Sequence, residues 1–336
     1  MPDNAAGPVP SVAIGIPAWN GARFLGAAIA SALAQTHNNI RLFVVDDCSQ
    51  DDTAAVAATY APRVTLHRNR HRLGIGANWN RCISLARDAD YLLIMHQDDL
   101  ISPDLVKRAL GLMAGDRRVD FVLSRVEQID DQNRPIARLR DAESEAIKDD
   151  TVVPGKHWFE RLMRGAMPMW GPVGGVARRS LYDRVGRFDE SYTYALDLQM
   201  YFRMVLASDV GLLGGPVYRW RRHADQATAR HHKGDRYAEV LRAKHFGCEL
   251  AQGSGGFDKG ALRRLRHALA DDCCRAARRY ALADPSYARR YLLEAWALRR
   301  TAVLTPDFIS ASLRRTWSSI FGPTAGGRKR YVRTDI

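Results

Sequence analysis

Residues 11–17, SVAIGIP, and residues 40–47, IRLFVVDD, decide the fold. Both runs are short, apolar and rich in β-branched residues, which predicts strands buried on both faces. Further runs alternate with them: strands at 64–67, 91–96 and 121–126, and helical patterns at 21–35, 52–60, 77–87 and 103–114. This alternation predicts an α/β fold with a Rossmann-like, mostly parallel sheet flanked by helices.

The bulk composition is that of an ordinary globular protein. The 336 residues are 46% hydrophobic and 26% charged, and the five cysteines form no C-x-x-C pair. An odd number of cysteines without such a pair argues against a disulfide framework and against a zinc site. No apolar run is long enough to span a membrane, and the opening MPDNAAGPVPS lacks the features of a secretory signal. We therefore expect a cytoplasmic protein.

The net charge of +13 lies almost wholly in the last third of the chain. Residues 201–336 carry 26 Lys and Arg against 12 Asp and Glu, whereas residues 1–200 carry 24 against 25. This excess predicts an anionic partner, such as a membrane surface, a phosphorylated lipid or nucleic acid; the alternative is a solvated basic helical face. Residues 127–157 are polar and predict an excursion across the surface, and residues 235–315 predict mainly helix.

Polar residues stand at the ends of the predicted strands. They are Pro17-Ala18-Trp19-Asn20, Asp46-Asp47, Asn69 and Asp98-Asp99. Ligands of parallel α/β sheets bind outside the carboxyl ends of the strands, so we expect these residues to line one crevice. Asp46 and Asp47 are suited to accept hydrogen bonds from a base imide or a ribose hydroxyl. Helix capping explains Ser49 or Asp51 in the same motif, but not the two strand-end carboxylates.

The segment from Asn69 to Asn80, NRHRLGIGANWN, contains a Gly-x-Gly pair. It lacks the third glycine of a dinucleotide fingerprint and the Lys-Ser/Thr of a phosphate loop. Arg70, Arg72 and a helix N-terminus near Ala77 are nevertheless suited to hold a diphosphate. A plain surface turn before a helix is an equally good interpretation.

Asp98 and Asp99 are adjacent carboxylates at the end of a buried strand, within the segment HQDD. Buried carboxylates repel one another unless a cation neutralises them. Mg²⁺ or Mn²⁺, which also takes oxygens from substrate phosphates, meets this need. Pairing with Arg or Lys is the alternative.

Five motifs in order, PAWN, VVDDCSQDDT, N-x4-G-x3-N, HQDD and FDE-x6-DLQMYFR, resemble glycosyltransferase family 2 over about residues 10–228. The resemblance implies an inverting enzyme of the GT-A type across residues 1–228. Its nucleotide-binding part would be about 10–126 and its acceptor and catalytic part about 155–228. Residues 229–336 would then form a basic, mainly helical C-terminal region.

The resemblance also implies roles for the residues that match its motifs. Pro17, Trp19, Asp47 and, less directly, Asp46 would receive the base and ribose; Trp19 replaces a frequent Tyr, and its ring can stack on uracil. Asp98 and Asp99 would hold the metal, with Asp99 favoured, although His96 replaces the first Asp of many members. His223 would lie near the diphosphate, together with Arg70 and Arg72. The resemblance thus implies cofactor-binding roles for Pro17, Trp19, Asp46, Asp47, Arg70, Arg72, Asp98 and His223.

Asp197 matches the catalytic base of the family, with Leu196 in place of a Glu. Its apolar neighbours predict a raised pKa, which suits a general base. A helix N-cap is the alternative role for this carboxylate. Trp170 to Gly175 and the turn at 186–190 resemble the acceptor and donor-sugar side of the site.

Taken together, these residues predict an inverting, metal-dependent transferase. It would move a sugar from a nucleoside-diphosphate donor, expected to be a UDP-sugar, to a hydroxyl of a saccharide or lipid-linked acceptor, as in bacterial surface polysaccharide synthesis. Residues 286–300 predict a helix that either packs on the domain or contacts the inner membrane face. Two other classes stay open: a catalytically silent nucleotide-sugar-binding relative, and a protein that binds nucleic acid or another anionic surface through its basic region.

Overall fold

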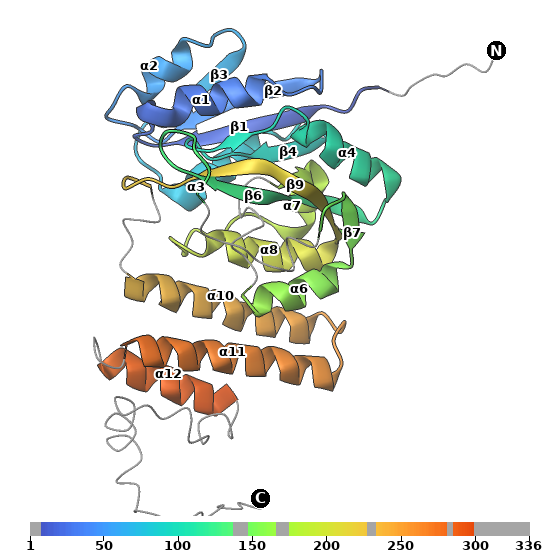
Figure 1. Ribbon diagram of the computed structural model, residues 1–336, viewed down its shortest axis with the longest axis vertical. Helices are drawn as coiled ribbons and strands as arrows, with labels where there is room; N and C mark the ends of the chain where they lie inside the picture. Colours follow the sequence, from blue (N-terminus) through green and yellow to red (C-terminus); the bar gives the residue numbers. More distant parts are fainter. Residues whose placement is uncertain (1–7, 137–146, 166–174, 227–232, 281–284, 299–336) are drawn as a thin grey trace, which may run out of the picture. The chain divides into compact units, whose positions relative to one another are not determined.

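The computed structural model describes residues 8–136, 147–165, 175–226, 233–280 and 285–298 (Figure 1). The chain divides into two units, residues 1–256 and residues 257–336.

The first unit is an α/β structure built on one nine-stranded sheet. Its strands are β1 (Val12–Ala18), β2 (Ile40–Asp46), β3 (Val64–Arg68), β4 (Tyr91–Ile94), β5 (Leu100–Ile101), β6 (Val119–Ile129), β7 (Thr151–Val153), β8 (Val176–Arg178) and β9 (Asp209–Arg221). Its described helices are α1 (Ala22–Leu33), α2 (Thr53–Ala58), α3 (Ile75–Leu85), α4 (Leu105–Gly115), α6 (Gly155–Met163), α7 (Arg179–Val185), α8 (Leu196–Ala207) and α10 (Lys233–Gly253). The expected α/β class, with helices flanking a sheet, is confirmed.

The strand order is β3-β2-β1-β4-β8-β6-β9-β5, with β7 paired to β9. The first four strands are parallel in this order, as expected from the strand–helix alternation. Beyond β4 the sheet is mixed, because β8 runs antiparallel to both β4 and β6, whereas β6 and β9 are parallel. The carboxyl ends of β2, β1 and β4 therefore lie side by side at one edge, where the strand-end carboxylates were expected to meet.

Strand β1 lies inside the sheet, and its alternating side chains face different helices. Ile14 and Ile16 join one buried cluster with apolar residues of α1 and α4. On the opposite face Gly15 leaves no room for a side chain, because an added Cβ would lie 2.9 Å from the Phe43 ring and 3.1 Å from the Cβ of Cys82 in α3. The sheet is thus covered by α1 and α4 on one face and by α3 on the other (Figure 1).

The expectation of a surface excursion over residues 127–157 is wrong at both ends of that segment. Strand β6 continues to Ile129, because its backbone stays paired with β9 as far as Arg221. Strand β7 and the first turn of α6 occupy residues 151–157. A strand that carries polar side chains on one face resembles a surface loop in its sequence, which explains the error.

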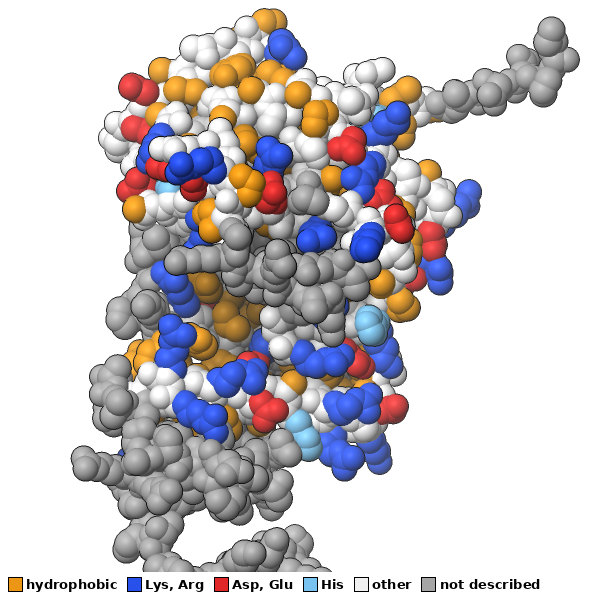
Figure 2. Space-filling view, viewed as in Figure 1, with side chains coloured by type: hydrophobic (Ala, Val, Ile, Leu, Met, Phe, Trp, Pro, Cys, Tyr) orange, Lys and Arg blue, Asp and Glu red, His pale blue; other side chains and the backbone are white. Residues whose placement is uncertain are grey.

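The described part of the second unit consists of α11 (Lys259–Tyr280) and α12 (Pro285–Leu298), which pack against one another. Apolar residues such as Leu265, Leu269 and Leu292 are buried, while arginines lie on the exposed faces. Figure 2 shows Lys and Arg side chains gathered over these helices. The helical prediction for 235–315 is confirmed as far as Leu298, apart from residues 281–284; these and residues 299–315 lie outside the described residues. Within the described chain, every helix is too short or too polar to cross a lipid bilayer.

Candidate functional site

The ends of β1 and β4 are joined by one side chain, Gln97. Its Oε1 accepts the backbone N–H of Trp19 at 2.9 Å, and its Nε2 donates to the carbonyl of Trp19 at 3.2 Å. Gly21 allows this close approach, because a Cβ there would lie 2.0 Å from Oε1 of Gln97. The PAWN and HQDD motifs therefore form one rim of the crevice.

Asp46 and Asp47 both face inward and serve the protein's own structure. Asp46 is 0% exposed; it accepts the N–H of Ser49 at 3.1 Å and forms an ion pair with Arg68 at 3.1 Å. Asp47 is 2% exposed. It accepts one side-chain and two backbone hydrogen bonds from the segment that follows β3. These donors are Asn69 Nδ2 at 2.8 Å, Leu73 N at 2.7 Å and Gly74 N at 2.9 Å. Asp47 thus fixes the loop 69–74.

That loop carries Arg72 over the ring of Trp19. The guanidinium carbon of Arg72 lies 3.5 Å from the ring centroid, which is a stacking distance. The Arg70 and Arg72 side chains are exposed. Helix α3 begins directly afterwards at Ile75, with Gly74 as its N-cap at φ 92°, slightly earlier than the start expected near Ala77. Arg72 therefore lies against the aromatic ring expected to receive a base, and Arg70 and the start of α3 are two and three residues from Arg72 in the sequence.

Asp99 is 0% exposed and is surrounded by donors. Its Oδ1 accepts the N–H of Arg221 at 2.8 Å, and its Oδ2 accepts the hydroxyl of Tyr218 at 2.7 Å. The Nδ1 of His96 lies 3.1 Å from the same Oδ2. Burial raises the pKa of Asp99, and the adjacent charge of Asp98 raises it further.

Asp98 is the more open of the two carboxylates, with a side chain that is 18% exposed. Its Oδ2 lies 2.9 Å from Nε2 of His223. Burial alone would raise the pKa of Asp98, but the hydrogen bond with His223 and the charge of His96 bring it below its ordinary value. Burial likewise would lower the pKa of His96, yet its hydrogen bond with Asp99 and the nearby carboxylates raise it. The pair is therefore electrostatically unequal, with the ionised form favoured at Asp98.

These positions fit a divalent cation on Asp98 better than on Asp99. One ligand atom each from His96, Asp98 and Asp99 lies within 4.8 Å of the others. Both oxygens of Asp99 already accept protein hydrogen bonds, whereas Asp98 engages only Oδ2 among the bonds described above. The alternative considered from the sequence was pairing of Asp98 and Asp99 with Arg or Lys side chains. The described partners of their carboxylates are instead two histidines, a tyrosine hydroxyl and a backbone N–H.

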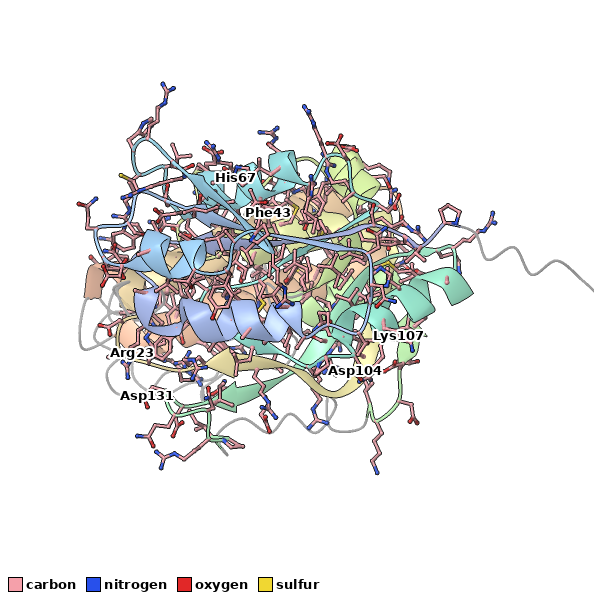
Figure 3. The ribbon with its side chains drawn as sticks, turned by 90° about the horizontal axis from the view of Figure 1, so that it is seen from above. Arg23, Phe43, His67, Asp104, Lys107 and Asp131 are labelled. Carbon is pink, nitrogen blue, oxygen red and sulfur yellow. The ribbon has the colours of Figure 1, made fainter. Side chains whose placement is uncertain are left out.

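Arg221 holds the Asp98-Asp99 turn through hydrogen bonds. Its side chain is almost wholly buried, and Nε donates to the carbonyl of Asp98 at 2.8 Å. The other guanidinium nitrogens donate to the carbonyl of Asp130 at 2.9 Å and to Oδ1 of Asn133 at 2.6 Å. Figure 3 shows the neighbouring ion pair between Arg23 of α1 and Asp131, which joins their side chains at 2.8 Å. Strand β9 and the turn after β6 are thereby tied to the crevice.

Asp197 lies in the first turn of α8 and is not its N-cap, which is Ala195. Its side chain is partly exposed, and Oδ1 accepts the N–H of Leu198 at 2.7 Å. Burial raises the pKa of Asp197 to about 6, although the Leu198 N–H and the charge of His96 act in the opposite direction. The charge of His96 acts on Asp197, and the same imidazole contacts Asp99, so His96 lies between the two groups in the electrostatics of this region.

The turn that precedes α8 is held by side chains from two helices. Asn80 of α3 accepts the N–H of Phe188 at 2.8 Å and donates to the carbonyl of Phe188 at 3.0 Å and to Glu190 at 2.8 Å. Arg203 of α8 donates to the carbonyl of Arg187 at 2.7 Å. The FDE motif is therefore a structural support for the start of α8.

The structure brings together most of the residues singled out in the sequence. Gln97, Tyr218, Arg221 and Asn80 were missed, although the segment YRWRRH contains two of them. The alternation of Arg221 with His223 across the end of β9 was the available signal for Arg221, since every second residue of a strand shares a face. Residues 170–174 of the expected acceptor side lie outside the described residues, whereas Gly175 directly precedes β8.

The chain is similar to known glycosyltransferases. Residues 13–167 match the family model for glycosyl transferase family 2. An uncharacterized glycosyltransferase of Rickettsia prowazekii is 27% identical over 222 residues, covering 65% of this chain and 66% of that protein. The succinoglycan biosynthesis protein ExoO of Rhizobium meliloti is 39% identical over 103 residues, 30% of this chain and 29% of that protein. Chondroitin synthase of Escherichia coli is 28% identical over 206 residues, 60% of this chain and 27% of that protein.

These matches span 66% or less of the length of each curated relative. Among solved structures, S. aureus TarS 1–349 superposes with a TM-score of 0.64 at 17% identity, covering 91% of this chain and 82% of that chain. The same protein in complex with UDP-GlcNAc gives a TM-score of 0.61 at 17% identity, covering 97% and 94%. At this identity the likeness shows the fold. Residues 13–167, which carry the ends of β1, β2 and β4, match the model of glycosyl transferase family 2, and the resemblance seen in the motifs is confirmed.

Proposed function

We propose that the protein transfers a sugar from a nucleoside-diphosphate donor to a hydroxyl group of an acceptor, with inversion at the anomeric carbon. Asp197 is the observation that carries this proposal. Burial raises the pKa of its carboxyl group to about 6, and the charge of His96, which contacts Asp99, acts on the same group. A general base works best when its pKa lies near the pH of the reaction.

In this reaction Asp197 accepts the proton of the acceptor hydroxyl while that oxygen attacks the anomeric carbon. The bond between the anomeric carbon and the diphosphate oxygen breaks in the same displacement, and the nucleoside diphosphate leaves. Attack from the face opposite the leaving group inverts the anomeric configuration. The position of Asp197 at the start of α8, and the motif FDE-x6-D that contains it, support this assignment.

Asp98 is the residue we propose for holding Mg²⁺ or Mn²⁺, with His96 beside it. A carboxylate oxygen and substrate phosphate oxygens are ligands that these ions prefer. The motif alone favours Asp99, but the donors from Tyr218 and Arg221 occupy both oxygens of that residue. Asp99 therefore serves to position the turn. When bound, the ion offsets the negative charge on the departing diphosphate.

For the nucleotide, we assign the base to the ring of Trp19. A base that stacks on the face now covered by Arg72 displaces that guanidinium, which has a stacking energy of only about 0.5–1 kcal/mol at an exposed site. Arg72 and Arg70 are then the cations proposed for the diphosphate, and His223 is proposed as a further hydrogen-bonding side chain there. The guanidinium charge complements the phosphates, because charge-assisted hydrogen bonds between Arg and phosphate are strong.

Three other residues of the nucleotide motif act mainly through the shape of the crevice. Pro17 is buried within β1, and the described bonds of Asp46 and Asp47 go to the protein itself. We propose that Asp47 contributes to donor binding by fixing the loop 69–74. Contacts of Asp46 or Asp47 with base or ribose would require these bonds to rearrange.

A UDP-sugar is the proposed donor, because the similar fold of TarS has been solved with UDP-GlcNAc and with UDP. A saccharide or lipid-linked acceptor is proposed from the names of two relatives, a succinoglycan biosynthesis protein and a chondroitin synthase. Transfer is assigned to the first unit, residues 1–228 together with α10, and the basic helices of the second unit are proposed to serve attachment.

The test of the proposal is UDP release from a panel of UDP-sugars, with Mn²⁺, Mg²⁺ or EDTA and a panel of saccharide and lipid-linked acceptors. Metal-dependent release by the wild type, with at least about 100-fold loss in Asp197→Asn, is the expected result for removal of a general base. The anomer formed, read by NMR, must be opposite to that of the donor. Nucleotide binding without turnover on every acceptor would favour the silent-relative alternative instead.

Attachment at the inner membrane face is the proposed role of the second unit. On α12, Arg289, Leu293 and Trp296 are exposed and spaced so that they share one face. A basic and aromatic face of this kind suits an anionic lipid surface. Arg289→Gln/Trp296→Ala should reduce co-sedimentation with phosphatidylglycerol vesicles, whereas Arg117→Gln in the first unit should not. Equal sedimentation of both variants, or binding to RNA alone, would count against the membrane role.

A further inference from the structure

Helix α10, outside the residues that resemble the family, holds the segment that leads into α8. One carboxylate of this helix, Glu239, accepts four hydrogen bonds from three consecutive residues. Its oxygens accept the N–H of Thr193 at 2.9 Å, the hydroxyl of Thr193 at 2.6 Å, the N–H of Tyr194 at 2.6 Å and the N–H of Ala195 at 3.0 Å. The convergence of so many donors on one side chain is a built binding arrangement rather than a chance surface contact.

A second residue of α10 reaches the same segment one turn later. Arg242 donates to the carbonyl of Ser191 at 3.1 Å and to its hydroxyl oxygen at 2.6 Å. Its guanidinium carbon also lies 4.0 Å from the ring centroid of Tyr192. Residues three apart on a helix lie on the same face, so Glu239 and Arg242 form a single clamp on residues 191–195.

The clamp acts at a helix start that no side chain caps. The N-cap of α8 is Ala195, and no side-chain cap hydrogen bond is made there. Glu239 accepts the N–H groups of Ala195 and of the two residues before it, and it places negative charge at this end of the helix, where the helix dipole favours it. Asp197 lies two residues after Ala195, so the position of the proposed base depends on how firmly this junction is held.

We propose that Glu239 and Arg242 are positioning residues for the transfer reaction: they fix residues 191–195 and thereby hold Asp197 in place for proton abstraction. This inference rests on the proposed function. A displacement of about 1 Å at a reacting group can reduce a rate about 100-fold, so loss of the clamp acts on turnover. The nucleotide crevice is formed by other residues, so donor binding is preserved.

The experiment compares Glu239→Ala, Glu239→Gln and Arg242→Gln with the wild type. Glu249→Gln is the matched control, since Glu249 is an exposed carboxylate on the same helix. The readouts are the UDP dissociation constant with Mn²⁺, kcat and KM for UDP release from an active UDP-sugar, and hydrogen exchange of peptides that cover residues 191–200. Circular dichroism checks that each variant is folded.

In Glu239→Ala we expect kcat to fall at least tenfold, with KM and the UDP dissociation constant within twofold of the wild type. Glu239→Gln keeps one acceptor oxygen and should therefore retain more of kcat than Glu239→Ala. Hydrogen exchange over residues 191–200 should be faster than in the wild type in Glu239→Gln, and faster still in Glu239→Ala. If Glu239→Ala does not fold, Glu239→Gln and Arg242→Gln carry the test. An active wild type with unchanged kcat in folded Glu239 variants, or unchanged exchange, overturns the clamp alone. A wild type without UDP binding or turnover overturns the proposed function, and the clamp with it.

Discussion

Replacing Asp197 with Asn should stabilise the protein and abolish its activity at the same time. The carboxyl has a pKa of about 6 in the folded chain, against 3.8 as its ordinary value. Such a group binds its proton more tightly when the chain is folded, so the unfolding free energy falls as pH rises from 3.8 to about 6. Well above pH 6 the ionised Asp197 lowers the unfolding free energy by its full amount, and below pH 3.8 it does not lower it.

The magnitude follows from the size of this pKa difference. Each pKa unit corresponds to about 1.4 kcal/mol, so ionised Asp197 costs the folded protein at most about 3 kcal/mol at pH 8. At pH 5 this loss of unfolding free energy is about 1.5 kcal/mol, because Asp197 is still protonated in most folded molecules. Asn keeps an oxygen that can accept the N–H of Leu198, so the substitution removes the charge without removing this bond.

The assay is urea unfolding of wild type and Asp197→Asn at pH 8 and pH 5, together with UDP release at pH 8. We expect a gain in unfolding free energy that is about 1.5 kcal/mol larger at pH 8 than at pH 5. Asp88→Asn, at a carboxyl with a 72% exposed side chain, is the control and should show no such difference. A variant that is destabilised, equally stabilised at both pH values, or active within a few-fold of the wild type would refute the assignment of Asp197.

Three further predictions concern the nucleotide crevice. Asp47→Asn should lower the unfolding free energy by about 2–4 kcal/mol and weaken UDP binding, because an amide cannot accept all three bonds that fix the loop; urea unfolding and calorimetry measure the two effects. Arg72→Ala should change stability by less than about 1 kcal/mol, since its described contact is exposed stacking on Trp19, yet raise KM for the donor in steady-state kinetics. Gly21→Ala should lower the unfolding free energy by about 1–3 kcal/mol, and the thermal midpoint with it, because its Cβ would displace the Gln97 side chain from its two hydrogen bonds with Trp19; an unchanged midpoint would contradict the tight junction.

The strands of the nucleotide half could be predicted because each was a continuous apolar run with a polar end. β1, β2 and β3 were expected at 11–17, 40–47 and 64–67 and lie at Val12–Ala18, Ile40–Asp46 and Val64–Arg68. Strands β7 and β8 were not separable from loops, because three residues are too few to show a period. Their pairing depends on neighbours that are distant in the sequence.

The site was predicted by residue type more readily than by role. Asp47 stands at a strand end, as expected, but sequence cannot show that its oxygens are occupied by the loop after β3. The same holds for Asp99, whose partners Tyr218 and Arg221 lie more than a hundred residues away. A role that depends on such long-range hydrogen bonds is visible only in three dimensions, whereas the presence of buried carboxylates is visible in the sequence.

The central claim is that the carboxyl ends of β1, β2 and β4 form a metal-dependent nucleotide-sugar site. The most direct test is titration calorimetry of UDP into the wild type and Asp98→Ala, each with Mn²⁺, Mg²⁺ or EDTA. We expect micromolar binding to the wild type that requires the metal and is lost in Asp98→Ala. UDP binding that is unaffected by EDTA and by Asp98→Ala, or no binding of UDP under any of these conditions, would contradict it.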